Sequence, residues 1–204
     1  MKINCDVQSC HFQIGPTGGD NGYSAITGHV GWGIAWYING LLIPEIYVVR
    51  GKTYTFVVEG GDDKEFPAGY HPFYITDDPE GGYEFKSERE RRRSRVFAGV
   101  EQTRFGGAVP SATGRLCEWK EDEKQPANFF TSFGAYQRSL SLFCQEGGFD
   151  CKGRPILVKL SDIAGQPGIL QWTPDRNTPD TVYYQCFTHR FLGWKINVVD
   201  RCDQ

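Results

Sequence analysis

The feature that most constrains this chain is a series of short β-prone segments separated by turn-forming residues. The 204 residues include 25 Gly and 11 Pro, and no stretch has the sustained 3.6-residue periodicity of a long helix. Residues 29–39, 53–59 and 138–144 alternate apolar and polar side chains, and Asn39-Gly40 is a tight-turn pair. We expect nine to eleven short strands, among them residues 73–76, 181–186 and 194–199. They predict an all-β fold, an antiparallel sandwich or barrel.

Three stretches carry more specific expectations. Residues 14–28 are rich in glycine, contain Pro16 and predict a loop. Residues 41–49 predict a strand that Pro44 interrupts, which indicates an edge position or a bulge. Residues 86–95 form the charge-dense run of the chain, and their mixed signs predict a solvated helical turn or loop. A docking patch for an acidic partner is the alternative.

Composition argues against several classes of protein. A net charge of −3 and a pI near 5.8 give no reason to expect nucleic acid or another polyanion as a partner. No apolar run reaches the roughly 18 residues that a membrane span needs. The first residues lack the charged and apolar regions of a secretory signal. We expect a mature or excised single domain over 1–204, with N-terminal strands or an arm over 1–38 and the core over 39–204.

The seven cysteines indicate the compartment. An odd number leaves at least one thiol unpaired. If Cys186 binds a metal, the other six can form three disulfides in any of 15 connectivities, and Cys144 and Cys151 could close a small loop. Six cysteines that can all pair predict an oxidising, secreted or extracellular setting. A cytosolic protein with seven thiols is the alternative. The disulfide candidates are Cys5, Cys10, Cys117, Cys144, Cys151 and Cys202.

A candidate metal site lies near the end of the chain. The aromatic, β-prone run from Tyr183 ends at Cys186, and His189 follows three residues later. A cysteine and a histidine in this spacing can place a thiolate and an imidazole on one metal ion, and His71 is the best candidate for a second imidazole. Two histidines and one cysteine form the ligand set of a blue-copper centre. The alternatives are a disulfide or buried thiol at Cys186 and a surface imidazole at His189.

The residues around these ligands predict a dry, rigid site. Gln185 and Phe187 flank the sulfur and would tune its hydrogen bonding and its exposure to water. Pro72 fixes the backbone beside His71. Several bulky side chains close to the ligands in sequence are candidates to surround and shield the metal: Tyr70, Phe73, Tyr74, Phe191 and Trp194.

The order of these residues resembles the cupredoxin pattern: an upstream histidine, a cysteine on the last residue of a strand and a histidine in the loop that follows. The loop from Cys186 to Leu192 (CFTHRFL) is similar to the short C-x-x-H-x-x-M loop of some cupredoxins, with Leu192 where the weak axial methionine would be. Residues 39–200, and in particular 39–56, 70–82 and 171–197, look like the C-terminal cupredoxin-like domain of Skeletor-type extracellular proteins, which are associated with DM13 and DOMON domains.

This resemblance implies a Greek-key β-sandwich or barrel, with disulfides and long loops, that holds one type 1-like copper at one end. The main departure is Leu192, which cannot coordinate a metal. A leucine at the axial position is compatible with three-coordinate copper of raised reduction potential. It is also compatible with an inactive descendant of the fold.

Three functions agree with these features. The first is an extracellular copper module that passes one electron to or from an unidentified protein. The second is a matrix or adhesion module that uses the fold as an interaction surface, with or without copper. The third is an oxidase by itself, but four histidines cannot supply a multicopper cluster in addition to this site. An electron-transfer or binding module is therefore favoured over an enzyme.

The remaining polar residues predict no second site. His11 and His29 lie in no motif and are expected to be structural or surface groups. Asp77, Asp78 and Glu80 could bind Ca²⁺ weakly, although an Asp-Asp-Pro turn explains them more simply. No G-x-S-x-G, H-E-x-x-H, P-loop or EF-hand pattern occurs. The sequence therefore predicts no catalytic residues.

Overall fold

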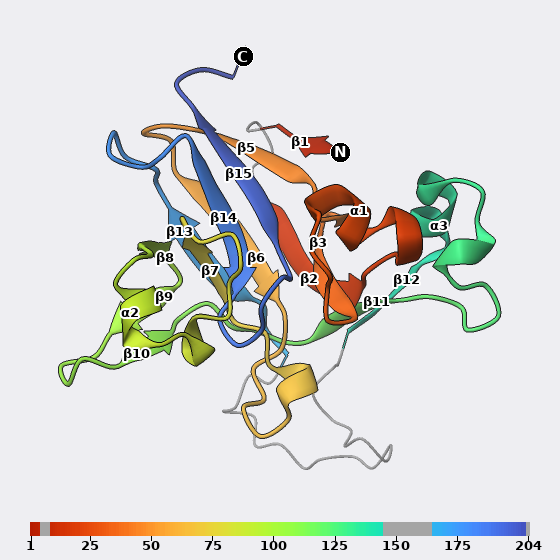
Figure 1. The fold of residues 1–204 in the computed structure, drawn as a ribbon, viewed down its shortest axis with the longest axis horizontal. Coiled ribbons are helices and arrows are strands. Elements are labelled where there is room, and N and C mark those ends of the chain that lie inside the picture. Colours follow the sequence, from red (N-terminus) through yellow and green to blue (C-terminus); the bar gives the residue numbers. More distant parts are fainter. Residues whose placement is uncertain (5–8, 145–164, 203–204) are drawn as a thin grey trace.

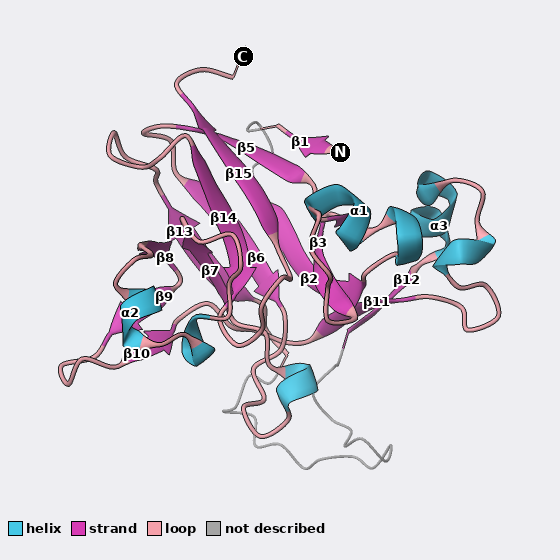
Figure 2. Cartoon of the chain, viewed as in Figure 1, coloured by secondary structure: helices cyan, strands magenta, loops and turns pink. Residues whose placement is uncertain are grey.

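Two β-sheets form the body of the protein (Figures 1 and 2). The computed structural model describes residues 1–4, 9–144 and 165–202. The first sheet has the strand order β1-β5-β15-β14-β7-β8. These strands are β1 (Lys2–Ile3), β5 (Glu45–Val49), β15 (Trp194–Val199), β14 (Thr181–Cys186), β7 (Phe73–Thr76) and β8 (Val96–Ala98).

The second sheet has the strand order β12-β11-β2-β3-β4, and β6 pairs with both β2 and β13. Its strands are β12 (Ser141–Cys144), β11 (Cys117–Lys120), β2 (Cys10–Pro16), β3 (Ile34–Ile38), β4 (Leu41–Leu42), β6 (Tyr54–Glu59) and β13 (Gly168–Trp172). A separate hairpin consists of β9 (Val100–Gln102) and β10 (Ala108–Pro110). The short helices are α1 (Tyr23–Thr27), α2 (Glu88–Arg91), α3 (Phe133–Ser139), η1 (Gly19–Asn21), η2 (Pro67–Gly69), η3 (Tyr83–Phe85) and η4 (Ala127–Phe129).

The all-β, sandwich-like class is confirmed, but the expectation of purely antiparallel sheets is wrong. Four strand pairs are parallel: β1 with β5, β5 with β15, β2 with β6 and β2 with β11. Alternation of apolar and polar residues identifies a strand but is the same for either direction of its neighbour. The described residues form 15 strands instead of nine to eleven, because several are only two or three residues long.

The chain crosses between the sheets directly after the β3–β4 hairpin. Asn39 and Gly40 have positive φ angles of 51° and 79°, as the predicted tight turn requires. The single strand expected over 41–49 is divided instead: β4 belongs to the second sheet and β5 to the first. Ile43, with φ 33°, and Pro44 lie at this crossing. Proline has no N–H for a ladder hydrogen bond, so the strand ends before it.

Helical turns replace an expected loop and part of an expected strand at two other places. Residues 14–28, expected to be a loop, include the end of β2 and the helices η1 and α1. The strand expected from Arg138 begins only at Ser141, because α3 extends to Ser139. The helical turn expected in the charged run is present as α2, where Ser87 and Glu90 form a reciprocal capping box.

Aromatic side chains from both sheets meet in the core. Phe12 of β2 lies 4.5 Å, centroid to centroid, from Phe73 of β7, and 5.6 Å from Tyr184 of β14. Trp36 and Phe56 of the second sheet also pack edge-on or tilted against Phe73. All five side chains are at most 1% exposed. This packing holds β7 and β14 rigidly at the point where the first sheet delivers the candidate ligands.

Candidate metal centre

Cys186 is the last residue of β14 and is completely buried. Its register partner is Phe73, the first residue of β7. The loop that follows returns at Gly193, where an added Cβ would collide with the Tyr184 carbonyl oxygen, so a larger residue cannot be accommodated there. Strand pairing and this close approach fix the cysteine and both ends of its loop.

His71 lies two residues before β7 and is 1% exposed. Its backbone N–H donates to the Gly60 carbonyl oxygen at 3.1 Å, and its Nε2 lies 3.1 Å from the Ala68 carbonyl oxygen. A carbonyl only accepts, so Nε2 carries the proton and Nδ1 keeps its lone pair. Nδ1 is buried and has no hydrogen-bond partner in the described structure. A buried, unpaired acceptor of this kind requires an explanation, and a bound metal supplies one.

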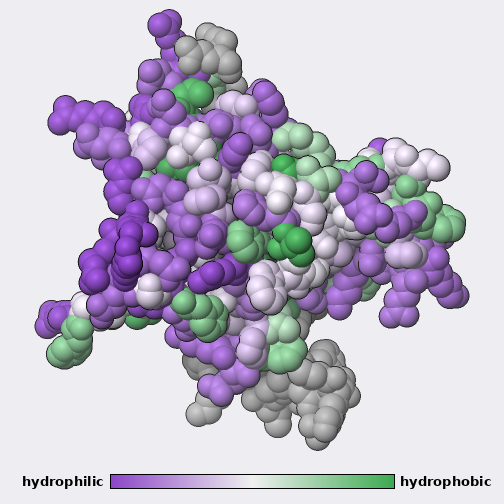
Figure 3. Space-filling view, viewed as in Figure 1, coloured by the Kyte–Doolittle hydropathy of each residue, from purple (hydrophilic) through white to green (hydrophobic). Residues whose placement is uncertain are grey.

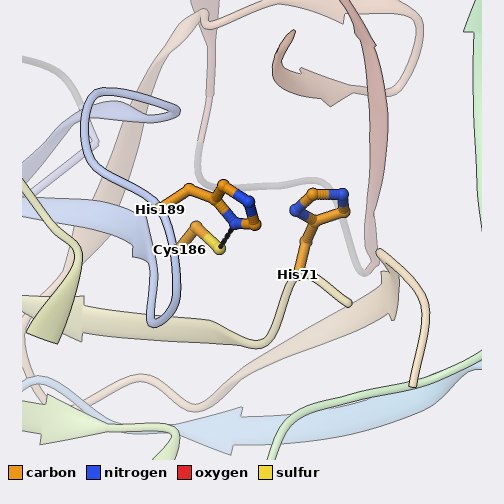
Figure 4. A group of neighbouring side chains, drawn as sticks. All are labelled: His71, Cys186 and His189. Carbon is orange, nitrogen blue, oxygen red and sulfur yellow. Dashed lines mark hydrogen bonds between the residues drawn. The ribbon is translucent and has the colours of Figure 1, made fainter. Parts of the chain in front are cut away.

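His189 brings the second imidazole to the same point (Figure 4). Its Nδ1 lies 3.8 Å from the Cys186 sulfur, and its ring centroid lies 4.7 Å from that of His71. One ligand atom from each of the three residues lies within 4.8 Å of the other two. The structure thus brings together the three residues that the sequence indicated as ligands, from two different strand ends.

The electrostatics of the metal-free site favour neutral groups. Burial, followed by the proximity of His189, lowers the pKa of His71 to about 4. Burial also lowers the pKa of His189. Burial raises the pKa of the Cys186 thiol to about 11, although hydrogen bonds from Thr188 and the backbone of His189 favour the thiolate. Both imidazoles are therefore uncharged at neutral pH, and a metal would have to displace the thiol proton.

Thr188 is a neighbour of the ligands that the sequence reasoning missed. Its hydroxyl donates to the Tyr70 carbonyl oxygen at 2.9 Å, and its oxygen lies 3.4 Å from the Cys186 sulfur and 2.8 Å from Nδ1 of His189. One small side chain thus joins the loop that precedes His71 to the two other candidate ligands. A hydroxyl two residues after a candidate cysteine is the signal that was available in the sequence.

In the described structure Gln185 forms no hydrogen bond with the Cys186 sulfur, contrary to the expectation. Its side chain donates to the Pro79 carbonyl oxygen at 2.7 Å and accepts from the Gly193 N–H at 3.1 Å. Alternation along β14 places it on the opposite face from Cys186. Its side chain thus connects the end of the loop that follows Cys186 to the segment that follows β7.

The other predicted neighbours are distributed around the loop. Phe187 packs against Tyr74 in a small buried cluster, and Tyr70 is 9% exposed. Leu192 is fully buried in the main core, where its carbonyl oxygen accepts from the Trp36 N–H at 2.8 Å. Trp194 opens β15, half-buried, with its ring against Tyr183.

His189 separates the buried ligands from two hollows on the surface. One, of about 480 Å³, is lined by residues that include Tyr70 and Phe187; the other, of about 390 Å³, includes Trp32. Both hollows include Phe85, Thr188 and His189. Of the three candidate ligands, His189 is thus the one that a molecule in either hollow would contact.

The acidic turn after β7 does not offer a calcium site. Asp77 pairs with Arg95 at 2.9 Å, and Asp78 pairs with the buried ammonium of Lys86 at 2.7 Å. Glu80 lies 3.4 Å from the same ammonium. Each carboxylate already has a cationic partner, in agreement with the simpler turn interpretation. His11 likewise pairs with a carboxylate, and His29 stacks on an aromatic ring.

The cysteines only partly follow the expected pairing. Cys117 of β11 is bonded to Cys144 of β12, so the predicted Cys144–Cys151 loop is wrong. Cys10 is a buried free thiol, so its assignment as a disulfide candidate is wrong as well, and Cys186 is not the sole free thiol. Sequence spacing cannot show that β11 and β12 place their cysteines opposite each other. Cys5 and Cys151 lie outside the described residues.

Glu59 lies beside this disulfide but does not form a metal site with it. Its carboxylate comes close to both bonded sulfurs, yet disulfide sulfurs are not thiolates and do not serve as metal ligands. Glu59 instead pairs with Arg115 at 2.8 Å.

Comparison with known proteins shows that the chain is similar to part of Skeletor. It is 61% identical over 192 residues, 94% of its length, to Protein Skeletor isoforms B/C and to isoforms D/E of Drosophila melanogaster. It spans 22% and 12% of these relatives. The Arabidopsis thaliana "Cytochrome b561, DM13 and DOMON domain-containing protein At5g54830" is 45% identical over 38 residues, 19% of this chain and 4% of that protein. The chain is homologous to a segment of Skeletor.

A family model, the At5g54830-like domain, matches residues 158–200 and so includes Cys186 and His189 but not His71. No solved structure matches the chain. Within the described ranges, no helix combines the length and apolar character that crossing a bilayer would require.

Proposed function

We propose that this Skeletor-like segment is an extracellular copper-binding module that exchanges single electrons with a protein partner. The observation that carries the proposal is the buried Nδ1 of His71, which has no hydrogen-bond partner in the described structure and lies beside the Cys186 thiol and the His189 imidazole. Burying an acceptor without a partner costs about 1–3 kcal/mol. A metal ligand role accounts for that cost.

The composition of the ligand set favours copper over zinc. Structural zinc sites take four protein ligands, whereas no fourth His, Cys, Asp or Glu joins this group in the described part of the chain. A thiolate and two imidazoles suit copper in both oxidation states, which allows one-electron exchange.

The surrounding residues support rapid exchange because they keep the ligands in place. Gln185 clamps the loop end, and Thr188 connects the backbone of Tyr70 to Cys186 and His189. The backbone N–H of Phe191 donates to the Glu80 carbonyl oxygen at 2.6 Å, which fixes the loop further. A rigid set of ligands rearranges little when the charge of the centre changes. The half-buried edge of His189 is a direct route to the outside.

An extracellular setting supports the proposal. The Cys117–Cys144 disulfide joins two neighbouring strands, and disulfides persist in oxidising compartments. The similarity to Skeletor extends over 94% of the chain. Single-electron exchange in that compartment requires a redox-active partner, which we propose is a protein.

Titration of the metal-free protein with Cu(II) tests the proposal. We expect one equivalent to bind, with an intense thiolate-to-copper absorption in the visible range and the small EPR hyperfine splitting of a copper thiolate. The same titration with Zn(II) is the colourless control. A protein that takes up no copper, or takes it up with the EPR spectrum of an ordinary tetragonal site, would refute the proposal and leave the matrix or adhesion module as the alternative.

A further inference from the structure

The turn that contains α2 carries a run of arginines that plays no part in the candidate metal centre. Residues 89–92 read Arg-Glu-Arg-Arg. Subtilisin-like proprotein convertases, endoproteases of the secretory pathway, cleave after an arginine that has a basic residue directly before it and another arginine three positions before it. Carboxylates in their clefts pair with these side chains. Arg92, Arg91 and Arg89 meet the three requirements in that order. Glu90 occupies the position that carries no strict requirement.

This segment, which we call the α2 turn (residues 87–94), lies on the surface. The four residues of α2 are exposed or half-buried, and Arg92 and Arg93 directly after it are exposed. The Arg92 side chain is 72% exposed and pairs with Glu88 at 3.2 Å, one helical turn earlier. Figure 3 shows strongly hydrophilic side chains gathered over α2. Exposed polar turns of this kind are the preferred places for proteolytic cleavage.

A protease binds its substrate in an extended conformation, so the α2 turn must unwind before it is cut. Its 4 helical residues are far fewer than the roughly 12–15 that sustain an isolated helix in water. The capping box of Ser87 and Glu90 holds the start of the turn. The Arg91 guanidinium donates to the carbonyl oxygens of Tyr83 and Glu84. Water replaces such surface hydrogen bonds at small net cost, so the turn can open locally while the core stays folded.

The chain is anchored on both sides of the α2 turn. Before it, the buried ammonium of Lys86 pairs with Asp78 at 2.7 Å. After it, the Arg95 N–H donates to the Asp77 carboxylate at 2.7 Å. Neither contact involves residues 87–94. Opening of the turn therefore leaves β7 and β8 in place.

The two parts of the chain on either side of the Arg92–Arg93 bond are interleaved in both sheets. Residues 1–92 contain β1 to β7, and residues 93–204 contain β8 to β15. Five strand pairs of the described structure join the two parts: β2–β11, β5–β15, β6–β13, β7–β8 and β7–β14. Phe12 and Tyr184 also pack across the cut in the core. A break in the α2 turn therefore leaves the two parts associated.

We propose that a subtilisin-like proprotein convertase cleaves this protein between Arg92 and Arg93, and that the product is a two-chain molecule held together by its sheets. Water adds across the peptide bond, which leaves a carboxylate on Arg92 and an ammonium group on Arg93. His71 then lies on the first chain, and Cys186 and His189 lie on the second. The proposal shares the extracellular setting with the proposed function and does not depend on copper.

Digestion of purified, metal-free protein with a recombinant proprotein convertase tests the cut. The mass spectrum of the denatured product should show residues 1–92 and 93–204. Gel filtration of the same product without denaturant should give one species of the original size, and separation of the two chains would overturn the two-chain molecule. A folded protein that stays intact while a synthetic peptide of residues 84–97 is cut, or fragments with other ends, would overturn the cleavage site.

Three exposed arginines provide matched variants. Arg92→Gln should abolish the cut, and Arg89→Gln should slow it about tenfold, because each variant loses a charge-assisted contact with the protease. Arg93→Gln removes the same charge beside the bond and should be cut at close to the wild-type rate. Trypsin requires only the arginine before the bond, so it should cut after Arg92 equally fast in wild type and in Arg89→Gln. Equal convertase rates for wild type and Arg89→Gln would contradict the proposed recognition.

Discussion

Acidification of the metal-free protein should expose the cost of burying His71. Its pKa is about 4 in the folded protein, whereas an unperturbed histidine titrates near 6.5. Between these values the unfolded chain binds a proton that the folded protein does not, so stability falls as the pH falls from 6.5 to 4. The two pKa values differ by about 2.5, and each unit corresponds to ~1.4 kcal/mol, which gives a loss of about 3.5 kcal/mol.

Urea unfolding at a series of pH values measures this loss. The free energy of unfolding of wild-type protein should decline across the window, and His71→Gln should decline much less. The pKa of His189 is also depressed by burial and gives both proteins a slope of the same sign. The pKa of Glu59 is lowered by its partners Arg115, Gln13 and His11 despite burial, and this carboxylate is the same in both proteins. Equal slopes for wild type and His71→Gln would refute the assignment of a buried, neutral His71.

Three further predictions concern the loop and the cysteines. Leu192→Met should lower the reduction potential with copper still bound, because a thioether at the axial position stabilises Cu(II) more than Cu(I); an unchanged potential and spectrum would show that Leu192 is not axial. Gln185→Leu should destabilise the protein by about 1–3 kcal/mol in urea unfolding, because the buried Gly193 N–H and the Pro79 carbonyl oxygen lose their partner; a change below ~0.5 kcal/mol would contradict the clamp. Alkylation of denatured, unreduced, metal-free protein should label Cys10 and Cys186 and spare the β11–β12 disulfide in peptide maps; labelling of the bridged pair would contradict the disulfide.

The strands that carry the candidate ligands were predictable because their patterns are local. Residues 73–76, 181–186 and 194–199 were each expected as strands and are β7, β14 and β15. The candidate ligands stand at the ends of such segments, so the sequence was sufficient to propose that His71 and Cys186 meet. Pro72 and the strand pairing then bring them together.

Features that depend on distant partners were not predictable in the same way. The direction of strand pairing and the opposition of Cys117 to Cys144 arise only when segments far apart in sequence align. The hydrogen bonds of Gln185 to Pro79 and Gly193 follow from the face on which its side chain lies and from the course of a loop about a hundred residues earlier. Alternation along β14 was the available clue that Gln185 and Cys186 face opposite ways.

The most direct test of a copper site at Cys186 compares two buried thiols. Both Cys10 and Cys186 are free and buried, but only Cys186 lies beside the two imidazoles. Copper content and visible absorption should be measured for Cys186→Ser and for the matched Cys10→Ser variant after identical loading. The account predicts loss of bound copper and of thiolate-to-copper absorption in Cys186→Ser, with both retained in Cys10→Ser. A full copper complement with unchanged absorption in Cys186→Ser would contradict it.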